Sequence, residues 1–281
     1  MKLFKEAAAI KIYIAALKKS GKTIGFVPTM GALHRGHISL AEQAKQKCDV
    51  MVCSIFVNPT QFNDATDFEK YPVTIGNDIL LLEKAGCDIV FLPSVKEIYP
   101  NGTDTPAKYD LGKIENLFEG KYRPGHFQGV CQVVHRLLDI ITPDDLFMGL
   151  KDYQQCLVIK QLVQLLQLPV QVHALSTYRE ESGLAMSSRN LRLTNEQRTR
   201  AAAIFKMLQY IKDNHTKNTL PDVQNYVKEY LLGNGFTSVD YVSVANADTL
   251  QPVSSIDSSQ KHVALIAAFI GEVRLIDNML L

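Results

Sequence analysis

Two histidines three residues apart, His34 and His37, are the side chains best suited to chemistry in this sequence. They follow an apolar run that stops at Pro28 and then a glycine turn, and they stand at the start of a segment with helical spacing. A helix that begins where a strand ends directs unpaired backbone N–H groups and the positive end of its dipole at one point, which suits an anion. On a helix this spacing puts both imidazoles on one face, and Gly36 between them would let a nucleotide approach the backbone. The pattern therefore predicts phosphate chemistry.

The competing interpretation is an ordinary strand-turn-helix joint, which every α/β protein contains, with its histidines at the surface or capping a helix. The complete HxGH pattern after a strand makes this interpretation weaker than it would be for a lone histidine. Partners supplied by the rest of the chain decide between the two.

Two polar segments offer cationic partners for a phosphate. In GLKDYQQ, residues 149–155, Lys151 stands where a helix opens, an unfavourable place for a cation unless an anion lies beside it. The alternative is a surface lysine paired with Asp152. In MSSRN, residues 186–190, two hydroxyls precede Arg189, and such a loop can bind phosphate oxygens, although it is more often simply solvated.

Two further segments offer groups for a small polar substrate. NPTQF, residues 58–62, places Asn58 and Gln61 at a strand end, and neutral amides can bond both hydroxyl and carboxylate groups. For Asn58 a turn with side-chain capping is an equally good interpretation. RPGHF, residues 123–127, brings Arg123 and His126 into a Gly-Pro loop that is either a mobile lid or a simple turn.

Strand and helix patterns alternate along the first part of the chain. After an N-terminal helix, strands are predicted at residues 23–27, 49–57, 87–93, 145–150 and 169–175, with helices at 38–47, 77–85, 129–141 and 153–166. This order predicts a Rossmann-like, doubly wound parallel sheet of the α/β class. Because ligands of such sheets bind beyond the carboxyl ends of the strands, residues 30–37, 58–62, 93–94 and 149–152 are expected to share one cleft.

The pattern changes near residue 176. A polar stretch is followed by helices near 195–214 and 221–233, and then by two alternating segments, 238–246 and 262–278, expected to be antiparallel strands. We therefore predict two domains, residues 1–176 and a smaller α+β domain of residues 177–281.

Composition limits the class of partner. The net charge of the 281 residues is +1, which gives no general electrostatic case for nucleic acid or an anionic membrane. The 5 cysteines are odd in number and lack CxxC spacing, as expected for buried thiols in a reducing compartment. Lysines interrupt the apolar residues near the N-terminus, unlike a signal peptide or membrane span. A cytoplasmic location is expected.

Six segments in order, PTMGALHRGH, SIFVNPTQF, YPNGT, RPGHFQGV, KDYQQ and GLAMSSRN, resemble the pantothenate synthetase (pantoate-beta-alanine ligase) family of HxGH nucleotidyltransferases. The resemblance covers essentially the whole chain. It implies ATP-dependent condensation of (R)-pantoate with β-alanine through a pantoyl-adenylate, with release of AMP and pyrophosphate, in pantothenate biosynthesis. It also implies Mg²⁺, a homodimer, ATP and pantoate binding by residues 1–176, and an active site covered by residues 177–281.

The resemblance also implies a site, residue by residue. The catalytic set is His34, His37, Lys151, Ser187, Ser188 and Arg189. The ATP-binding set is Met30, Gly31, Ala32, Leu33, His34, Arg35, Gly36, His37, Gly149, Leu150, Lys151, Asp152, Tyr178, Met186, Ser187, Ser188 and Arg189. The substrate set is Met30, Asn58, Gln61, Tyr71, Arg123, His126 and Gln155, and Asp78 is the expected metal ligand. The chain departs from the family pattern at Leu150, where the family usually has glutamate, and at Asn77, where it often has an acidic residue.

Two other functions compete with this one. A nucleotidyltransferase that joins a nucleotide to a phosphorylated metabolite would need additional basic residues, whereas the strand ends offer the neutral Asn58, Gln61 and Gln155. A catalytically silent nucleotide-binding protein on the same fold should have lost some of the histidines, Lys151 or Arg189, and all are present.

Overall fold

The computed structural model describes residues 1–103 and 108–281, which form two compact units. The first unit comprises residues 1–112, 123–150 and 155–176, and the second comprises 113–122, 151–154 and 177–281. The two predicted domains, 1–176 and 177–281, stay a prediction. The compact units differ from them because two short segments from the first part of the chain pack with the second unit.

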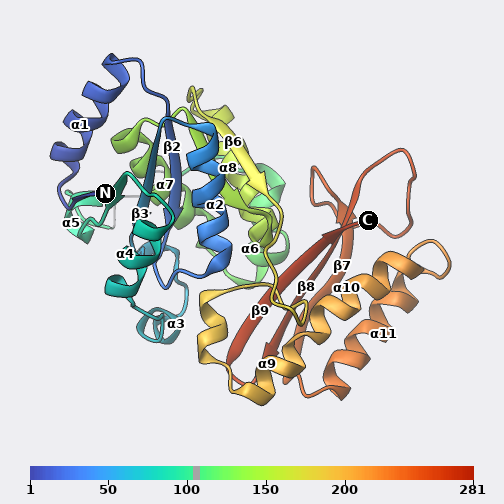
Figure 1. The fold of residues 1–281 in the computed structure, drawn as a ribbon. Coiled ribbons are helices and arrows are strands. Elements are labelled where there is room, and N and C mark those ends of the chain that lie inside the picture. Colours follow the sequence, from blue (N-terminus) through green and yellow to red (C-terminus); the bar gives the residue numbers. More distant parts are fainter. Residues whose placement is uncertain (104–107) are drawn as a thin grey trace. The chain divides into compact units, whose positions relative to one another are not determined.

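A six-stranded parallel sheet in the order β1-β4-β3-β2-β5-β6 forms the centre of the first unit (Figure 1). Its strands are β1 (Lys2–Phe4), β2 (Ile24–Thr29), β3 (Val50–Ile55), β4 (Ile89–Phe91), β5 (Asp145–Gly149) and β6 (Gln171–Leu175). Its longer helices are α1 (Ala7–Lys19), α2 (Arg35–Lys47), α4 (Ile75–Lys84), α7 (His126–Ile141) and α8 (Tyr153–Leu165), with the short α3 (Ala65–Glu69) and α5 (Val95–Ile98). The predicted Rossmann-like doubly wound sheet is confirmed.

The order of the strands marks the place for a ligand. Strand β2 pairs with β3 on one side and with β5 on the other, so the chain's winding reverses direction next to β2. In open α/β sheets the crevice at such a reversal, beyond the carboxyl ends of the strands, is where ligands bind. The residues that follow β2, including both histidines of the HxGH pattern, stand at this point.

Apolar burial fixes these elements. Every residue of β3 is buried, which explains why its sequence is a continuous apolar run rather than an alternating one. Helix α2 buries Ile38, Leu40, Ala41 and Ala44, one apolar stripe, and packs them with β2 and β3 residues in one core. All five cysteines are buried free thiols.

Several elements of the first unit have other bounds than expected or were not expected at all. A short strand, β1, precedes α1 and pairs with β4, where the sequence predicted only a helix. Strand β2 continues through Pro28, which lies opposite Ser54 in the register, to Thr29. Helix α2 begins at Arg35, three residues earlier than the apolar spacing indicated, because the polar first turn carries no periodic signal.

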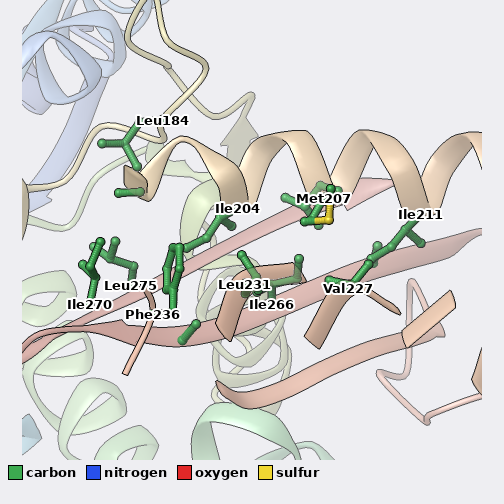
Figure 2. Close-up of a cluster of buried hydrophobic side chains, with 14 of the residues drawn as sticks. Leu184, Ile204, Met207, Ile211, Val227, Leu231, Phe236, Ile266, Ile270 and Leu275 are labelled. Atoms are coloured by element: carbon green, nitrogen blue, oxygen red, sulfur yellow. The ribbon is translucent and has the colours of Figure 1, made fainter. Parts of the chain in front are cut away.

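The second unit is an antiparallel sheet of β7 (Ser238–Asn246), β8 (His262–Ile270) and β9 (Val273–Leu280), with α6 (Phe118–Tyr122), α9 (Asn195–Ala201), α10 (Ala203–Asn214) and α11 (Leu220–Gly233). Figure 2 shows its core, where Ile204 and Met207 of α10 and Leu231 of α11 gather with Ile266 of β8. The segment 262–278, predicted as one strand, is a hairpin that turns next to Gly271, whose φ is 58°. The expected helix 195–214 is two helices that meet at Ala202.

A buried ion-pair network holds residues 113–122 in the second unit. Arg274 of β9 makes two hydrogen bonds to the Glu119 carboxylate, 2.7 and 2.8 Å long, and a third of 2.7 Å to Asp240. Tyr241 donates to the same Glu119 carboxylate over 2.9 Å.

Among the described residues, no helix is long and apolar enough to cross a membrane.

Candidate active site

The turn after β2 is sharply bent and held by side chains. Gly31 and Ala32 both have positive φ angles, 83° and 48°. The Thr29 hydroxyl donates to the Ser54 carbonyl over 2.7 Å and accepts from the Gly31 N–H over 3.2 Å. A Cβ at Gly31 would lie 3.1 Å from an Asp78 carboxylate oxygen, so the left-handed backbone and the close approach both favour glycine.

Asp78 of α4 is the second support of this turn. Its side chain is fully buried, and its carboxylate accepts from Ala32 N over 2.9 Å and from Leu33 N over 2.8 Å. The Thr74 hydroxyl donates a third hydrogen bond of 2.9 Å. The carboxylate thus lies against backbone amides rather than in an open acidic site.

The two imidazoles orient each other at the start of α2. His34 is the N-cap, and its Nδ1 accepts from Gly36 N over 3.2 Å, while His37 Nδ1 accepts from His34 N over 3.3 Å. The ring centroids lie 4.0 Å apart. Because each Nδ1 is an acceptor, a neutral ring carries its proton on Nε2. Both rings can therefore offer an Nε2–H to an oxyanion.

This geometry changes the expected source of anion binding. The sequence predicted unpaired backbone N–H groups at this helix start, but Ala32, Leu33, His34 and Gly36 all donate within the protein. The donors suited to a phosphate are the imidazoles, with the backbone amides used to orient them.

Asn58 and Gln61 follow β3 and lie in one buried cluster. The Asn58 side chain is 1% exposed and donates to Gln61 Oε1 and to the Gly129 carbonyl, both over 3.2 Å. Tyr99 donates to Asn58 Oδ1 over 2.8 Å. Gln61 Nε2 in turn lies 3.1 Å from the Met30 sulfur, so the turn after β2 and the loop after β3 meet.

Arg123 and His126 hold the backbone of this loop. His126 is buried, and its Nδ1 lies 2.8 Å from the Gln61 carbonyl oxygen. Arg123 lies 3.1 Å from His126 Nε2 and also donates to the Gln61 carbonyl over 3.5 Å. With Arg123 donating, Nε2 is the acceptor and Nδ1 carries the proton. Tyr71 is buried and packs edge-on against Phe62, with centroids 5.8 Å apart.

Other predicted residues belong to different places. Gly149, Leu150 and the half-buried Gln155 are in the first unit, at the end of β5 and in α8. Lys151 and Asp152 belong to the second unit, where the Lys151 ammonium lies 3.2 Å from the Asp152 carboxylate. The contact between Lys151 and Asp152 that the sequence left open is therefore present.

Residues 178–189 of the second unit, which lead into the predicted phosphate-binding segment 186–190, are held by charged pairs. Arg179 makes hydrogen bonds of 2.5 and 3.0 Å to the buried Asp277 carboxylate of β9. Met186 N donates to the Tyr178 carbonyl over 2.9 Å, and the Ser187 hydroxyl accepts from Arg189 N over 3.3 Å. Ser188 is buried.

Sequence reasoning missed the side chains that hold this loop. Besides Arg179 and Asp277, they include Asn190, which donates to Glu180 and to the Ala185 carbonyl over 3.1 Å each. Asn190 lies inside the MSSRN pattern, which was the available signal. Asp277, the partner of Arg179, is 98 residues away in sequence, and no sequence pattern indicated this pair.

Cys48 and Cys87 are poor nucleophiles at neutral pH. Burial raises the pKa of Cys87 to about 12, and burial together with the neighbouring Asp145 carboxylate raises the pKa of Cys48 to about 12. A thiol must lose its proton to attack or to bind a metal. The chemistry of the site therefore rests on imidazole, amide, hydroxyl and cationic groups.

Comparison with known proteins gives one consistent family. A family model described as pantoate-beta-alanine ligase matches residues 2–280. A pantothenate synthetase of Porphyromonas gingivalis is 45% identical over 279 residues, 99% of each chain. One of Cytophaga hutchinsonii is 46% identical over 274 residues, which cover 97% of this chain and 96% of the relative.

Solved structures agree. A pantothenate synthetase of Thermus thermophilus superposes with a TM-score of 0.90 at 38% identity and covers 99% of both chains. A pantoate-beta-alanine ligase of Francisella tularensis, solved with beta-gamma ATP and beta-alanine, has a TM-score of 0.85 at 37% identity and covers 100% of this chain and 97% of its own.

Proposed function

Because this chain belongs to the pantoate-beta-alanine ligase family, we propose that it joins pantoate to β-alanine through an acyl-adenylate, with ATP as the activating substrate. The observation that carries the proposal is the pair of imidazoles after β2, in each of which Nδ1 accepts a backbone N–H, in a turn whose Met30 contacts a buried amide cluster. The ATP and beta-alanine bound in the Francisella relative support the choice of substrates.

Activation is required because a carboxylate oxygen is a poor leaving group. In the first step a pantoate carboxylate oxygen attacks the α-phosphorus, the bond to the bridging oxygen breaks, and pyrophosphate leaves. Negative charge grows on the phosphate oxygens during this step. In this scheme the Nε2–H groups of His34 and His37 donate to those oxygens, and pre-organised donors of this kind usually contribute more to such catalysis than any other single effect.

In the second step the β-alanine amine attacks the acyl carbonyl, and the carbonyl's bond to AMP breaks. The amine nitrogen loses a proton as the amide forms. In this scheme Gln61 and Gln155 hold pantoate, while Asn58 orients Gln61 by donating to its Oε1. The carbonyl of Gln61 is held by His126 and Arg123, so these two residues position the pocket through its backbone.

All the ATP contacts stay predictions, those of residues 30–37, Gly149 and Leu150 in the first unit as well as those in the second unit: Lys151, Asp152, Tyr178, Met186, Ser187, Ser188 and Arg189. A homodimer and a cytoplasmic location also stay predictions.

The part of the chain that the structure describes has no metal site built from three or more His, Cys, Asp or Glu side chains. The Asp78 carboxylate accepts three hydrogen bonds already. Mg²⁺ is commonly held by substrate phosphates with few protein ligands. No step of the mechanism is assigned to the ion, and Asp78 as its ligand stays a prediction.

Exchange of labelled pyrophosphate into ATP tests the proposal directly. The exchange should require pantoate, proceed without β-alanine, and give way to net AMP formation when β-alanine is added. Two results would exclude the pantoyl-adenylate route. One is pyrophosphate exchange that proceeds equally well without pantoate. The other is AMP formation that needs all three substrates, with no pyrophosphate exchange before β-alanine is added.

A further inference from the structure

The buried carboxylate of Asp78 belongs to α4, yet its hydrogen bonds lead to the turn that carries the two imidazoles. We propose that Asp78 is a positioning residue for adenylation, which holds the Ala32–Leu33 backbone so that His34 and His37 keep their orientation. This inference rests on the proposed function. It assigns to Asp78 a role that needs no metal.

The conformation of the turn requires a restraint. Ala32 has a φ of 48°, a left-handed conformation that is uncommon for a residue with a Cβ and persists only where its surroundings impose it. The Asp78 carboxylate supplies this restraint, because its two oxygens accept from Ala32 N and Leu33 N over 2.9 and 2.8 Å. Gly31 permits the approach, since its missing side chain would stand 3.1 Å from Asp78 Oδ2.

A short covalent path links this restraint to the imidazoles. Leu33 precedes His34, whose N–H donates to His37 Nδ1, and two residues later Gly36 N donates to His34 Nδ1. These two bonds are 3.3 and 3.2 Å long, near the upper limit for a hydrogen bond, so a modest shift at Leu33 breaks them. Once these bonds are broken, nothing in this path keeps the proton of each imidazole on Nε2.

Burial separates this role from metal binding. Mg²⁺ prefers an accessible, hydrated carboxylate and usually retains several waters. Asp78 is 0% exposed, and besides the two amides its carboxylate accepts from Thr74 Oγ1 over 2.9 Å. A ligand role would require the carboxylate to release the turn that it holds.

The experiment compares Asp78→Asn with Thr74→Val and with Asn77→Ala. The asparagine keeps the shape but turns an N–H group toward one of the two backbone amides. Thr74→Val removes only the hydroxyl donor, and Asn77 is the exposed neighbour on α4. Each variant is assayed for pantoate-dependent pyrophosphate exchange over a range of pantoate and Mg²⁺ concentrations, and for amide hydrogen exchange without ligands.

Asp78→Asn should lower kcat about 10²-fold, the usual effect of displacing catalytic groups by an ångström, with the KM for pantoate and the half-saturating Mg²⁺ concentration little changed. The amides of Ala32 and Leu33 should exchange faster, while those of β3 keep their protection. Thr74→Val should show the same pattern at about tenfold or less, because both amide bonds remain. Asn77→Ala should match the wild type.

Two results would overturn the positioning role: a rise in half-saturating Mg²⁺ that accounts for the lost activity, or unchanged exchange of the Ala32 and Leu33 amides. If Asp78→Asn loses protection throughout the first unit, Thr74→Val decides by the same two criteria. Absence of pantoate-dependent pyrophosphate exchange in the wild type would instead refute the proposed function. The amide hydrogen exchange would still test whether Asp78 holds the Ala32–Leu33 backbone.

Discussion

Two segments contain residues that are expected to contact ATP, and they are fixed in opposite ways. The turn between β2 and α2 is held mainly by hydrogen bonds to its backbone, from Thr29, Asp78 and the imidazoles themselves. Residues 178–189 of the second unit are held by charge, through Arg179 on Asp277 and through Glu180 on Arg198. The first arrangement orients neutral donors over short distances, whereas the second ties a cationic loop to a distant strand.

Removing the ion pair of the second unit should have the largest effect on stability. Asp277→Ala leaves the Arg179 guanidinium without the carboxylate that accepts two of its hydrogen bonds, and such a loss costs about 3–5 kcal/mol. Urea unfolding followed by far-UV circular dichroism measures this directly. A loss below about 1 kcal/mol would show that charge does not anchor this loop.

Removing one donor from the turn after β2, or the Lys151 ammonium from the second unit, should affect the rate while the fold stays intact. His37→Ala and Lys151→Ala should each lower the rate of adenylate formation by at least about 10²-fold, near 2.7 kcal/mol. Single-turnover quench-flow with ATP and pantoate gives this rate. Near-normal adenylate formation in either variant would contradict the role proposed for that residue.

Changing the amide pocket should alter recognition of one substrate only. Gln61→Ala should raise the apparent KM for pantoate about tenfold, near 1.4 kcal/mol, because one amide contact is lost. The KM for ATP should change much less. Steady-state titration of both substrates checks this, and equal increases in the two values would contradict the placement of Gln61 in the pantoate pocket.

An exposed pair supplies the smallest effect and a matched control for Asp277→Ala. Arg35 and Glu42 form an ion pair on α2 with nitrogen and oxygen 2.7 Å apart, but both side chains are more than a third exposed. Glu42→Gln should reduce the free energy of unfolding by less than about 1 kcal/mol. The same urea titration measures it, and a loss as large as that of Asp277→Ala would mean that burial does not set the difference.

The sequence predicted the parts of the fold whose signals are local. A continuous apolar run gave β3, and the glycine turn before His34 placed the histidines at the start of α2. The hairpin at Gly271 was missed because a short turn between two apolar strands resembles one long strand. The split between α9 and α10 was missed because Ala202 carries no helix-breaking signal.

The candidate site was predictable in its residue types and only partly in its geometry. HxGH located the imidazoles, but the bonds that orient them depend on Asp78, which is 46 residues from Ala32 and was expected to bind metal. Such contacts are decided by tertiary packing, and no regular spacing of residues in the sequence indicates them. The roles of individual residues toward ATP and pantoate stay predictions.

Residues 113–122 have a consequence for the order in which the protein can be made. They leave the ribosome long before β7 and β9, whose Tyr241 and Arg274 donate hydrogen bonds to Glu119. During synthesis the Glu119 carboxylate must therefore remain hydrated in a segment whose flanks already belong to the first unit. A gene cut after residue 176 would leave this carboxylate without its arginine, and a fragment of residues 177–281 would keep Arg274 and Asp240 but lack Glu119.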